Sequence, residues 1–262
     1  MSRYRLHRIV AIASVLLAFC GSHAHAQKIG IVVMHGKEAP GDAMRPVGNL
    51  LSTAGYLVEV PEMCWSKRRI YDLPYLDCMK DIDAAAERLK KRGATDLVIY
   101  GQSVGGNMAL GYGANRQGLK GIIVTAGGHN PGGIIGSNPQ IGKAFAQAKQ
   151  MIADGKGDQR TRFSDNNDTG PFFVNVTPKT YVSWYEPAGD ANMHLNARKL
   201  TAPLLWISGD ADPLQRLVKP IVDAAPAHPL NRHVTIKATH RGTPTAAHAT
   251  VVQWLKELAA HK

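Results

Sequence analysis

Three side chains of the sequence have the types that nucleophilic catalysis at a carbonyl group requires: Ser103, Asp212 and His240. A serine hydroxyl is a weak nucleophile until an imidazole takes its proton. The imidazole works best when a carboxylate holds its tautomer and stabilises the imidazolium ion. Ser103 stands at the centre of the pattern G-x-S-x-G, residues 101–105. The three residues together predict acyl transfer through a Ser-His-Asp triad.

Each of these residues follows an apolar stretch that is typical of a buried strand: 96–100, 203–208 and 232–238. The carboxyl ends of parallel strands meet at one edge of a sheet, where helix N-termini point unpaired N–H groups at a ligand. We therefore expect the three side chains to meet at that edge.

Backbone N–H groups at the same edge are expected to form an oxyanion hole. Val104 begins the helix after the serine, so its N–H faces the charge that develops on the substrate oxygen. Another predicted strand, 28–34, is followed by His35, Gly36 and Lys37, and the N–H of Gly36 or Lys37 is the expected second donor.

Several alternatives remain open at this stage. Asp210 is a second choice of acid beside Asp212. Taken singly, Ser103 also fits a helix N-cap, Asp212 a turn residue before a proline, and His240 a surface histidine. Their joint occurrence after successive strands favours the triad. The ammonium group of Lys37 either attracts an anionic substrate or is simply solvated.

The order of the expected elements indicates an α/β fold with a doubly wound, mostly parallel sheet of about six strands. Strands are predicted over residues 28–34, 56–60, 96–100, 119–125, 203–208 and 232–238. Helices are predicted over residues 44–54, 76–92, 105–115, 141–153, 214–225 and 245–260.

The strand and helix alternation stops at about residue 129 and resumes at about residue 200. This stretch has no apolar strand pair of comparable strength, so it is expected to be an inserted cap. It contains an aromatic group that either forms the cap's own core or lines a pocket: Phe172, Phe173, Tyr181, Trp184 and Tyr185. His129 and His194 flank the insertion and are given no role.

With these residues in view, the chain resembles the α/β-hydrolase family over residues 27–262. The matching positions are His35-Gly36, the G-x-S-x-G of residues 101–105, Gly209-x-x-Asp212 and His240. The resemblance implies an acyl-enzyme mechanism, most simply on a small carboxylic ester, and a cap after the strand that follows the serine. Peptidase, thioesterase and non-catalytic binding functions on the same scaffold are the alternatives. Against the family pattern, two leading antiparallel strands have no counterpart here.

Residues 1–26 have the pattern of a cleaved signal peptide: three arginines, an apolar run and Ala24-His25-Ala26. The run is too short for a membrane span, and a lipid anchor on Cys20 is a weaker alternative because bulky Phe19 precedes it. A periplasmic or secreted protein is expected. In such a compartment Cys64 and Cys78 are expected to form a disulfide, with two separate thiols as the alternative.

The full chain of 262 residues has a net charge of +11 and is 44% hydrophobic. Removal of residues 1–26 leaves 28 basic against 20 acidic residues, a net charge of +8. This moderate charge, without a basic element carrying stacking aromatic residues, argues against a nucleic-acid partner. No metal-ligand spacing or nucleotide-binding motif occurs, so no metal or cofactor is expected.

Overall fold

A six-stranded, wholly parallel sheet forms the centre of the molecule in the computed structural model, which describes residues 28–167 and 169–261. The strand order is β2-β1-β3-β4-β7-β8. Their bounds are β1 (Ile29–Met34), β2 (Leu57–Glu59), β3 (Asp96–Gln102), β4 (Gly121–Thr125), β7 (Leu204–Gly209) and β8 (Arg232–Ile236). The predicted doubly wound fold is confirmed, whereas the predicted signal peptide lies outside the described residues.

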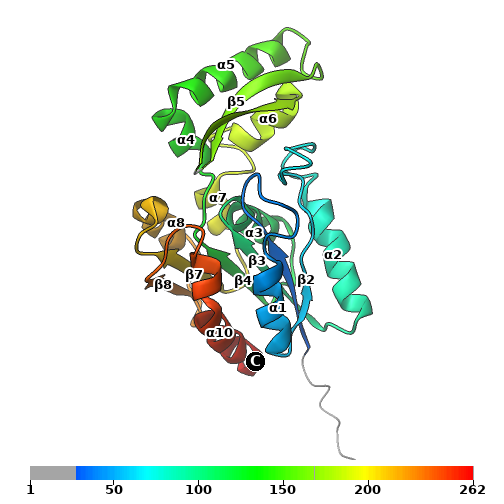
Figure 1. Ribbon diagram of the computed structural model, residues 1–262, viewed down its shortest axis with the longest axis vertical. Helices are drawn as coiled ribbons and strands as arrows, with labels where there is room; N and C mark the ends of the chain where they lie inside the picture. The colour runs from blue at the N-terminus through cyan, green and yellow to red at the C-terminus, as the bar shows by residue number, and fades with distance from the viewer. Residues whose placement is uncertain (1–27, 168, 262) are drawn as a thin grey trace, which may run out of the picture.

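Helices cover both faces of this sheet (Figure 1). Alternate residues of β1 enter different cores: Val32 and Met34 on one face, Ile31 and Val33 on the other. The first core includes residues of α2 (Met79–Lys91) and α3 (Val104–Asn115). The second includes residues of α1 (Arg45–Thr53) and α10 (His248–Ala260). A strand buried on both faces explains the continuous apolar runs in the sequence.

Two predicted helices are each divided. Residues 214–225 form the 3₁₀-helix η1 (Pro213–Leu217) and the short helix α8 (Lys219–Asp223). Pro220 lies in the first turn of α8, where its missing N–H removes no helical hydrogen bond, so a new helix begins there. Residues 245–260 form α9 (Thr243–Ala246) and α10. None of the described helices combines the length and the apolar character that crossing a membrane requires.

Between β4 and β7 the chain leaves the sheet as what we name the inserted segment (residues 129–200), most of which forms a separate lobe, while its last helix packs on α3 and α8 (Figure 1). Its elements are α4 (Pro131–Ser137), α5 (Pro139–Ala153), β5 (Thr161–Asn167), β6 (Gly170–Val176), α6 (Pro178–Tyr185) and α7 (Met193–Ala197). β5 and β6 pair as an antiparallel hairpin, against which α5 packs.

The β5–β6 hairpin was not expected, because the sequence of the inserted segment predicts no strand pair as apolar as the strands of the sheet. β5 has the sequence TRFSDNN, in which only Phe163 is a large apolar residue, and the other buried position is Asp165. A charged residue on the inward face hides the period of two that usually reveals a half-buried strand. The pattern of β5 is therefore too polar for the strand to be predicted from the sequence.

Aromatic side chains form the core of the inserted segment and its joint with the rest of the chain. Tyr181 stacks on both Phe163 and Tyr185 with ring centroids 4.6 Å apart. Trp184 contacts the Tyr75 ring edge to face at 4.9 Å, and its indole N–H donates to the carbonyl of Leu73. Of the group named from the sequence, Phe173 is instead largely exposed.

The buried amide of Asn107 in α3 holds the inserted segment at two points. Its Nδ2 donates to the carbonyl oxygens of His129 and Ala191, each at 2.7 Å, and its Oδ1 accepts from the Tyr75 hydroxyl at 2.7 Å. One fully bonded side chain therefore ties the inserted segment to the helix that begins at Ser103.

Candidate active site

Ser103 occupies the sharp turn between β3 and α3 in a left-handed conformation, with φ 56°. In this turn the backbones of neighbouring segments lie in close contact. A Cβ atom on Gly101 would lie 1.9 Å from the carbonyl oxygen of Gly105, and one on Gly105 would lie 2.8 Å from the carbonyl oxygen of His35. The two glycines of G-x-S-x-G are thus required by packing, and the serine is held in a strained backbone conformation.

The structure brings the three predicted catalytic side chains together. Oγ of Ser103 lies 3.0 Å from Nε2 of His240, and Nδ1 of His240 lies 2.8 Å from Oδ2 of Asp212. A carboxylate accepts hydrogen bonds only, so Nδ1 carries the proton and Nε2 presents its lone pair to the serine hydroxyl. This geometry permits His240 to take the proton of Ser103.

Asp212 is also the better placed of the two candidate acids. Its side chain is nearly fully buried, and Oδ1 accepts the N–H of Leu214 at 2.9 Å while Oδ2 faces His240. Asp210 points elsewhere, with its Oδ1 accepting the N–H of Ala238 at 3.0 Å. The alternative acid therefore supports the loop that leads to His240 and makes no contact with the imidazole among the hydrogen bonds of the described residues.

The proposed donors of an oxyanion hole lie beside Ser103. Val104 is the first residue of α3 and is fully buried. A Cβ atom on Gly36 would lie 3.3 Å from Cβ of Ser103 and 2.3 Å from Oε1 of Gln102. The backbone at Gly36 can approach the serine this closely only because it has no side chain.

His35 shapes the turn that contains Gly36. Its Nε2 accepts the N–H of Met63 at 3.2 Å, and its Nδ1 lies 2.8 Å from the carbonyl oxygen of Gly36. Because a carbonyl only accepts and an amide N–H only donates, the imidazole is neutral with its proton on Nδ1. Burial lowers the pKa of His35, which favours the same neutral form.

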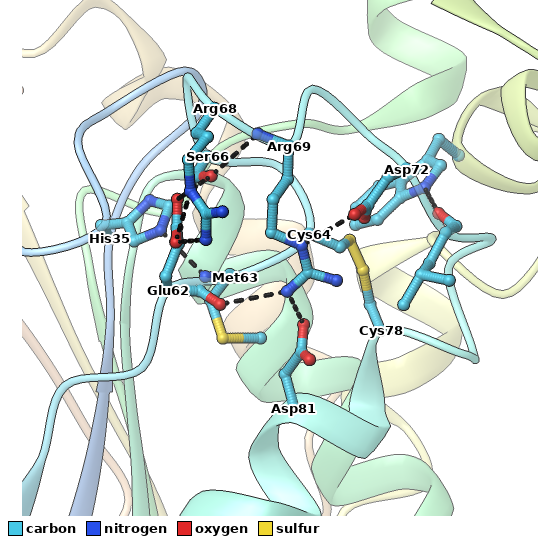
Figure 2. Close-up of polar contacts among 12 residues, drawn as sticks. His35, Glu62, Met63, Cys64, Ser66, Arg68, Arg69, Asp72, Cys78 and Asp81 are labelled. Atoms are coloured by element: carbon cyan, nitrogen blue, oxygen red, sulfur yellow. Dashed lines mark hydrogen bonds and ion pairs between the residues drawn. A yellow bond between two sulfur atoms is a disulfide. The ribbon is translucent and has the colours of Figure 1, made fainter.

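The segment that presents Met63 is fixed by a network of charged side chains (Figure 2). Glu62 accepts hydrogen bonds from Arg68 and from Oγ of Ser66, and these hold the pKa of its carboxyl at about 2. Arg69 bridges the carbonyl of Glu62 and the carboxylate of Asp81 in α2. The charged groups thus join the loop after β2 to the first turn of α2.

A disulfide joins Cys64 and Cys78 in the same region (Figure 2). Their Cα atoms are 5.8 Å apart, within the usual range for a disulfide, and both side chains are fully buried. The bridge fixes Cys64, which follows Met63 directly, to the residue before α2. It closes the loop that carries Trp65 and Tyr71 into the core.

A cleft of about 1020 Å³ opens over Ser103, Asp212 and His240. Its lining includes the apolar side chains Ile134, Met193, Leu214, Leu217, Val218 and Ile221. It also includes the polar side chains Lys37, Asn138, Asn166, Asn167 and Thr169. The inserted segment contributes side chains of both kinds, so it borders the space in which a substrate would lie.

Lys37 and His129 are buried beside this cleft in ways that the sequence did not predict. The interpretation of Lys37 as a solvated cation is wrong, because its ammonium forms an ion pair with buried Asp165 at 2.8 Å. His129 bonds the carbonyl of Trp184, and burial together with the charge of Lys37 lowers its pKa to about 3. His194 is exposed on α7. No sequence signal links Lys37 to Asp165, which lies 128 positions away.

The described residues offer no metal site. No cluster of three or more His, Cys, Asp or Glu side chains is arranged around a common point in the part of the chain that the structure covers.

Residues 66–250 match the protein family described as Serine aminopeptidase, S33. The chain belongs to this family of α/β-hydrolases. The matched region includes Ser103, Asp212 and His240, whereas Gly36 and Lys37 lie before it. No curated protein sequence matches the chain.

Solved structures of other α/β-hydrolases share the fold at low sequence identity. Est1E from Butyrivibrio proteoclasticus, solved with ferulic acid, gives a TM-score of 0.67 at 17% identity over 92% of this chain and 93% of that chain. A monoacylglycerol lipase from Paleococcus ferrophilus gives 0.63 at 17% identity over 89% and 95%. A thermostable carboxyl esterase from Bacillus coagulans gives 0.63 at 14% identity over 89% and 91%. At these identities the likeness concerns the fold.

Proposed function

We propose that this α/β-hydrolase is an exported serine hydrolase that cleaves small carboxylic esters through an acyl-enzyme intermediate. The observation that carries the proposal is the unbroken hydrogen-bonded chain from Ser103 through His240 to Asp212 at the floor of the cleft. The carboxyl esterase and the monoacylglycerol lipase with the same fold favour an ester over other acyl substrates. Export is supported by the signal-peptide pattern of residues 1–26 and by the disulfide.

The proposed reaction has two acyl-transfer steps. His240 takes the hydroxyl proton as Ser103 attacks the ester carbonyl, and the N–H groups of Val104 and of Gly36 or Lys37 stabilise the oxyanion. His240 then protonates the leaving alcohol, which gives an acyl group on Ser103. A water molecule, deprotonated by His240, attacks this acyl group, and His240 returns the proton to Oγ of Ser103 as the acid is released. Asp212 keeps His240 oriented and stabilises its charged form.

We propose that the inserted segment acts as a cap over this site. Its residues Ile134, Met193, Asn166 and Thr169 line the cleft. A cleft lined by both apolar and polar side chains suits an ester that carries groups of both kinds.

A panel of nitrophenyl esters and matching nitroanilides with graded acyl lengths tests the function. We expect ester hydrolysis by the wild type, at least about 10³-fold slower hydrolysis by Ser103→Ala, and little cleavage of the nitroanilides. Faster cleavage of amides than of esters would indicate a peptidase instead. Binding of an ester without turnover by the wild type would indicate a non-catalytic binding protein.

A further inference from the structure

The turn after β1, residues 36–38, is held from two separate parts of the chain. On the side of the main domain, the indole N–H of Trp65 donates to the carbonyl of His35 at 2.9 Å, and the N–H of Glu38 donates to the carbonyl of Trp65 at 3.0 Å. On the other side, the contacts come from the inserted segment. This turn carries both Gly36 and Lys37, whose N–H groups are the proposed second donors of the oxyanion hole.

The Lys37 ammonium bonds the inserted segment with all three of its N–H groups. Nζ donates to Oδ1 of Asp165 at 2.8 Å, to the carbonyl of Asn166 at 3.1 Å and to the hydroxyl of Tyr185 at 3.3 Å. The Tyr185 hydroxyl in turn donates to Oδ1 of Asp165, which closes a ring of hydrogen bonds. An ammonium has only three donors, so no donor of Lys37 remains for a substrate.

The contact between Lys37 and Asp165 is buried. The Lys37 side chain is 9% exposed and that of Asp165 is fully buried. Charges in such an environment are poorly screened, and removal of one partner leaves the other charge buried and unpaired. The Lys37 ammonium also lies 5.8 Å and 5.7 Å from the ring centroids of Tyr71 and Tyr185, so its position is restrained.

A second contact joins the same two parts, between the next residue of the turn and the end of β5. Nδ2 of Asn167 donates to Oε2 of Glu38 at 2.6 Å. The end of β5 therefore bonds two consecutive residues of the turn. Since a Cβ on Gly36 would already lie 3.3 Å from Cβ of Ser103, a small movement of this turn changes the position of its N–H groups relative to the serine.

We propose that Asp165 is a positioning residue for the oxyanion hole: through Lys37 it holds the turn at residues 36–37, so that the hole is complete only while the inserted segment is docked on this turn. The inference rests on the proposed hydrolase function. It couples the placement of the cap to the chemical step, because Asp165 belongs to the cap and acts on a turn of the main domain.

Kinetics of Asp165→Asn and Lys37→Met test the proposal. Both variants keep the backbone N–H groups of the turn but remove the ion pair. We expect kcat on a nitrophenyl ester to fall about 10- to 100-fold, which is less than the loss caused by deleting an oxyanion-hole donor, because the N–H groups are displaced and not removed. KM and the pH dependence of kcat/KM should stay unchanged. Asp158→Asn makes the same chemical change in an exposed ion pair of the inserted segment with Lys179, and its kcat should equal that of the wild type.

Hydrogen exchange provides a readout that does not depend on activity. Amides of residues 36–39 should exchange faster in Asp165→Asn than in the wild type or Asp158→Asn, while amides of α3 stay equally protected. If Asp165→Asn fails to fold, Tyr185→Phe removes the bridging hydroxyl alone, and we expect faster exchange in the same turn with a smaller fall in kcat.

Unchanged kcat and unchanged exchange at residues 36–39 in these variants would overturn the positioning role. A raised KM with wild-type kcat would also overturn it, because the ion pair would then act on substrate binding. Failure of the proposed function has a different signature, namely that the wild type itself shows no hydrolysis that depends on Ser103.

Discussion

Oδ2 of Asp212 lies 2.8 Å from Nδ1 of His240, while the other oxygen of the same carboxylate accepts the N–H of Leu214 at the start of η1. The carboxylate is thus fixed by backbone on one side and faces the imidazole with the other. The loop contains two aspartates, Asp210 and Asp212, and the geometry assigns Asp212 as the acid that orients His240.

Asp212→Asn should lower kcat by about 10⁴-fold, because an amide can hold His240 in the wrong tautomer and cannot stabilise its charge. Asp210→Asn is the matched control, since Asn keeps an acceptor for the N–H of Ala238, and we expect a change of less than about 10-fold. Steady-state ester hydrolysis measures both. A larger loss in Asp210→Asn than in Asp212→Asn would show that the acid is wrongly assigned.

Gly101→Ala should destabilise the protein by about 3 kcal/mol or more, since the new methyl group would meet the carbonyl of Gly105 and backbone cannot move aside as a side chain does. Gly136→Ala is the control: nothing lies within 4 Å of its Cβ position in α4, so we expect a change within about 1 kcal/mol, toward higher stability. Chemical denaturation gives both free energies. Equal stability of the two variants would argue against the tight turn at Ser103.

Replacement of both cysteines, Cys64→Ala with Cys78→Ala, should lower the free energy of unfolding by roughly 3 kcal/mol, because the bridge closes a loop of about 15 residues in the unfolded chain. Urea denaturation without reductant measures the loss. Reductant should bring the wild type toward the variant and leave the variant unchanged. A wild type that reductant does not affect, with mass showing two free thiols, would mean that the cysteines do not pair.

The free energy of unfolding should fall as the pH drops from 7.5 to 5. The pKa of His129 is about 3 in the folded protein, so His129 stays neutral there, and burial lowers the pKa of His35, so His35 holds fewer protons in the folded than in the unfolded state. When unfolded, both take up protons below about pH 6.5. The unfolded state then binds more protons, and stability rises with pH by at most about 1.4 kcal/mol per unit for each histidine. His35→Gln should show a shallower slope than the wild type. An equally steep slope in His35→Gln would exclude the contribution of His35.

The sheet and the candidate site were predictable because they depend on local patterns. Apolar runs such as IGIVVM in β1 and GIIVT in β4 are buried on both faces and need no distant partner to be recognised. The G-x-S-x-G sequence is equally local, since its two glycines are required by contacts within one turn and with the adjacent strand end. The order of the strands then places Asp212 and His240 at the same edge.

The contacts between the inserted segment and the main domain were not predictable, because they depend on pairing across distance. The side chains that bond the buried carboxylate of Asp165 are those of Lys37 and Tyr185, and neither residue is near it in the sequence. Lys37 is likewise buried by its contacts with β5, a strand that has few apolar residues. A single sequence carries no local signal for such a pair.

Labelling by a fluorophosphonate probe tests the central claim most directly, because phosphonylation requires a serine activated by a neighbouring base. We expect the intact mass of the wild type to increase by one probe adduct, peptide mapping to place the adduct on Ser103, and Ser103→Ala to remain unlabelled. Labelling should be much slower in His240→Ala. A folded wild type that the probe does not modify, or a Ser103→Ala variant that is labelled equally well, would contradict the assignment of Ser103 as the nucleophile.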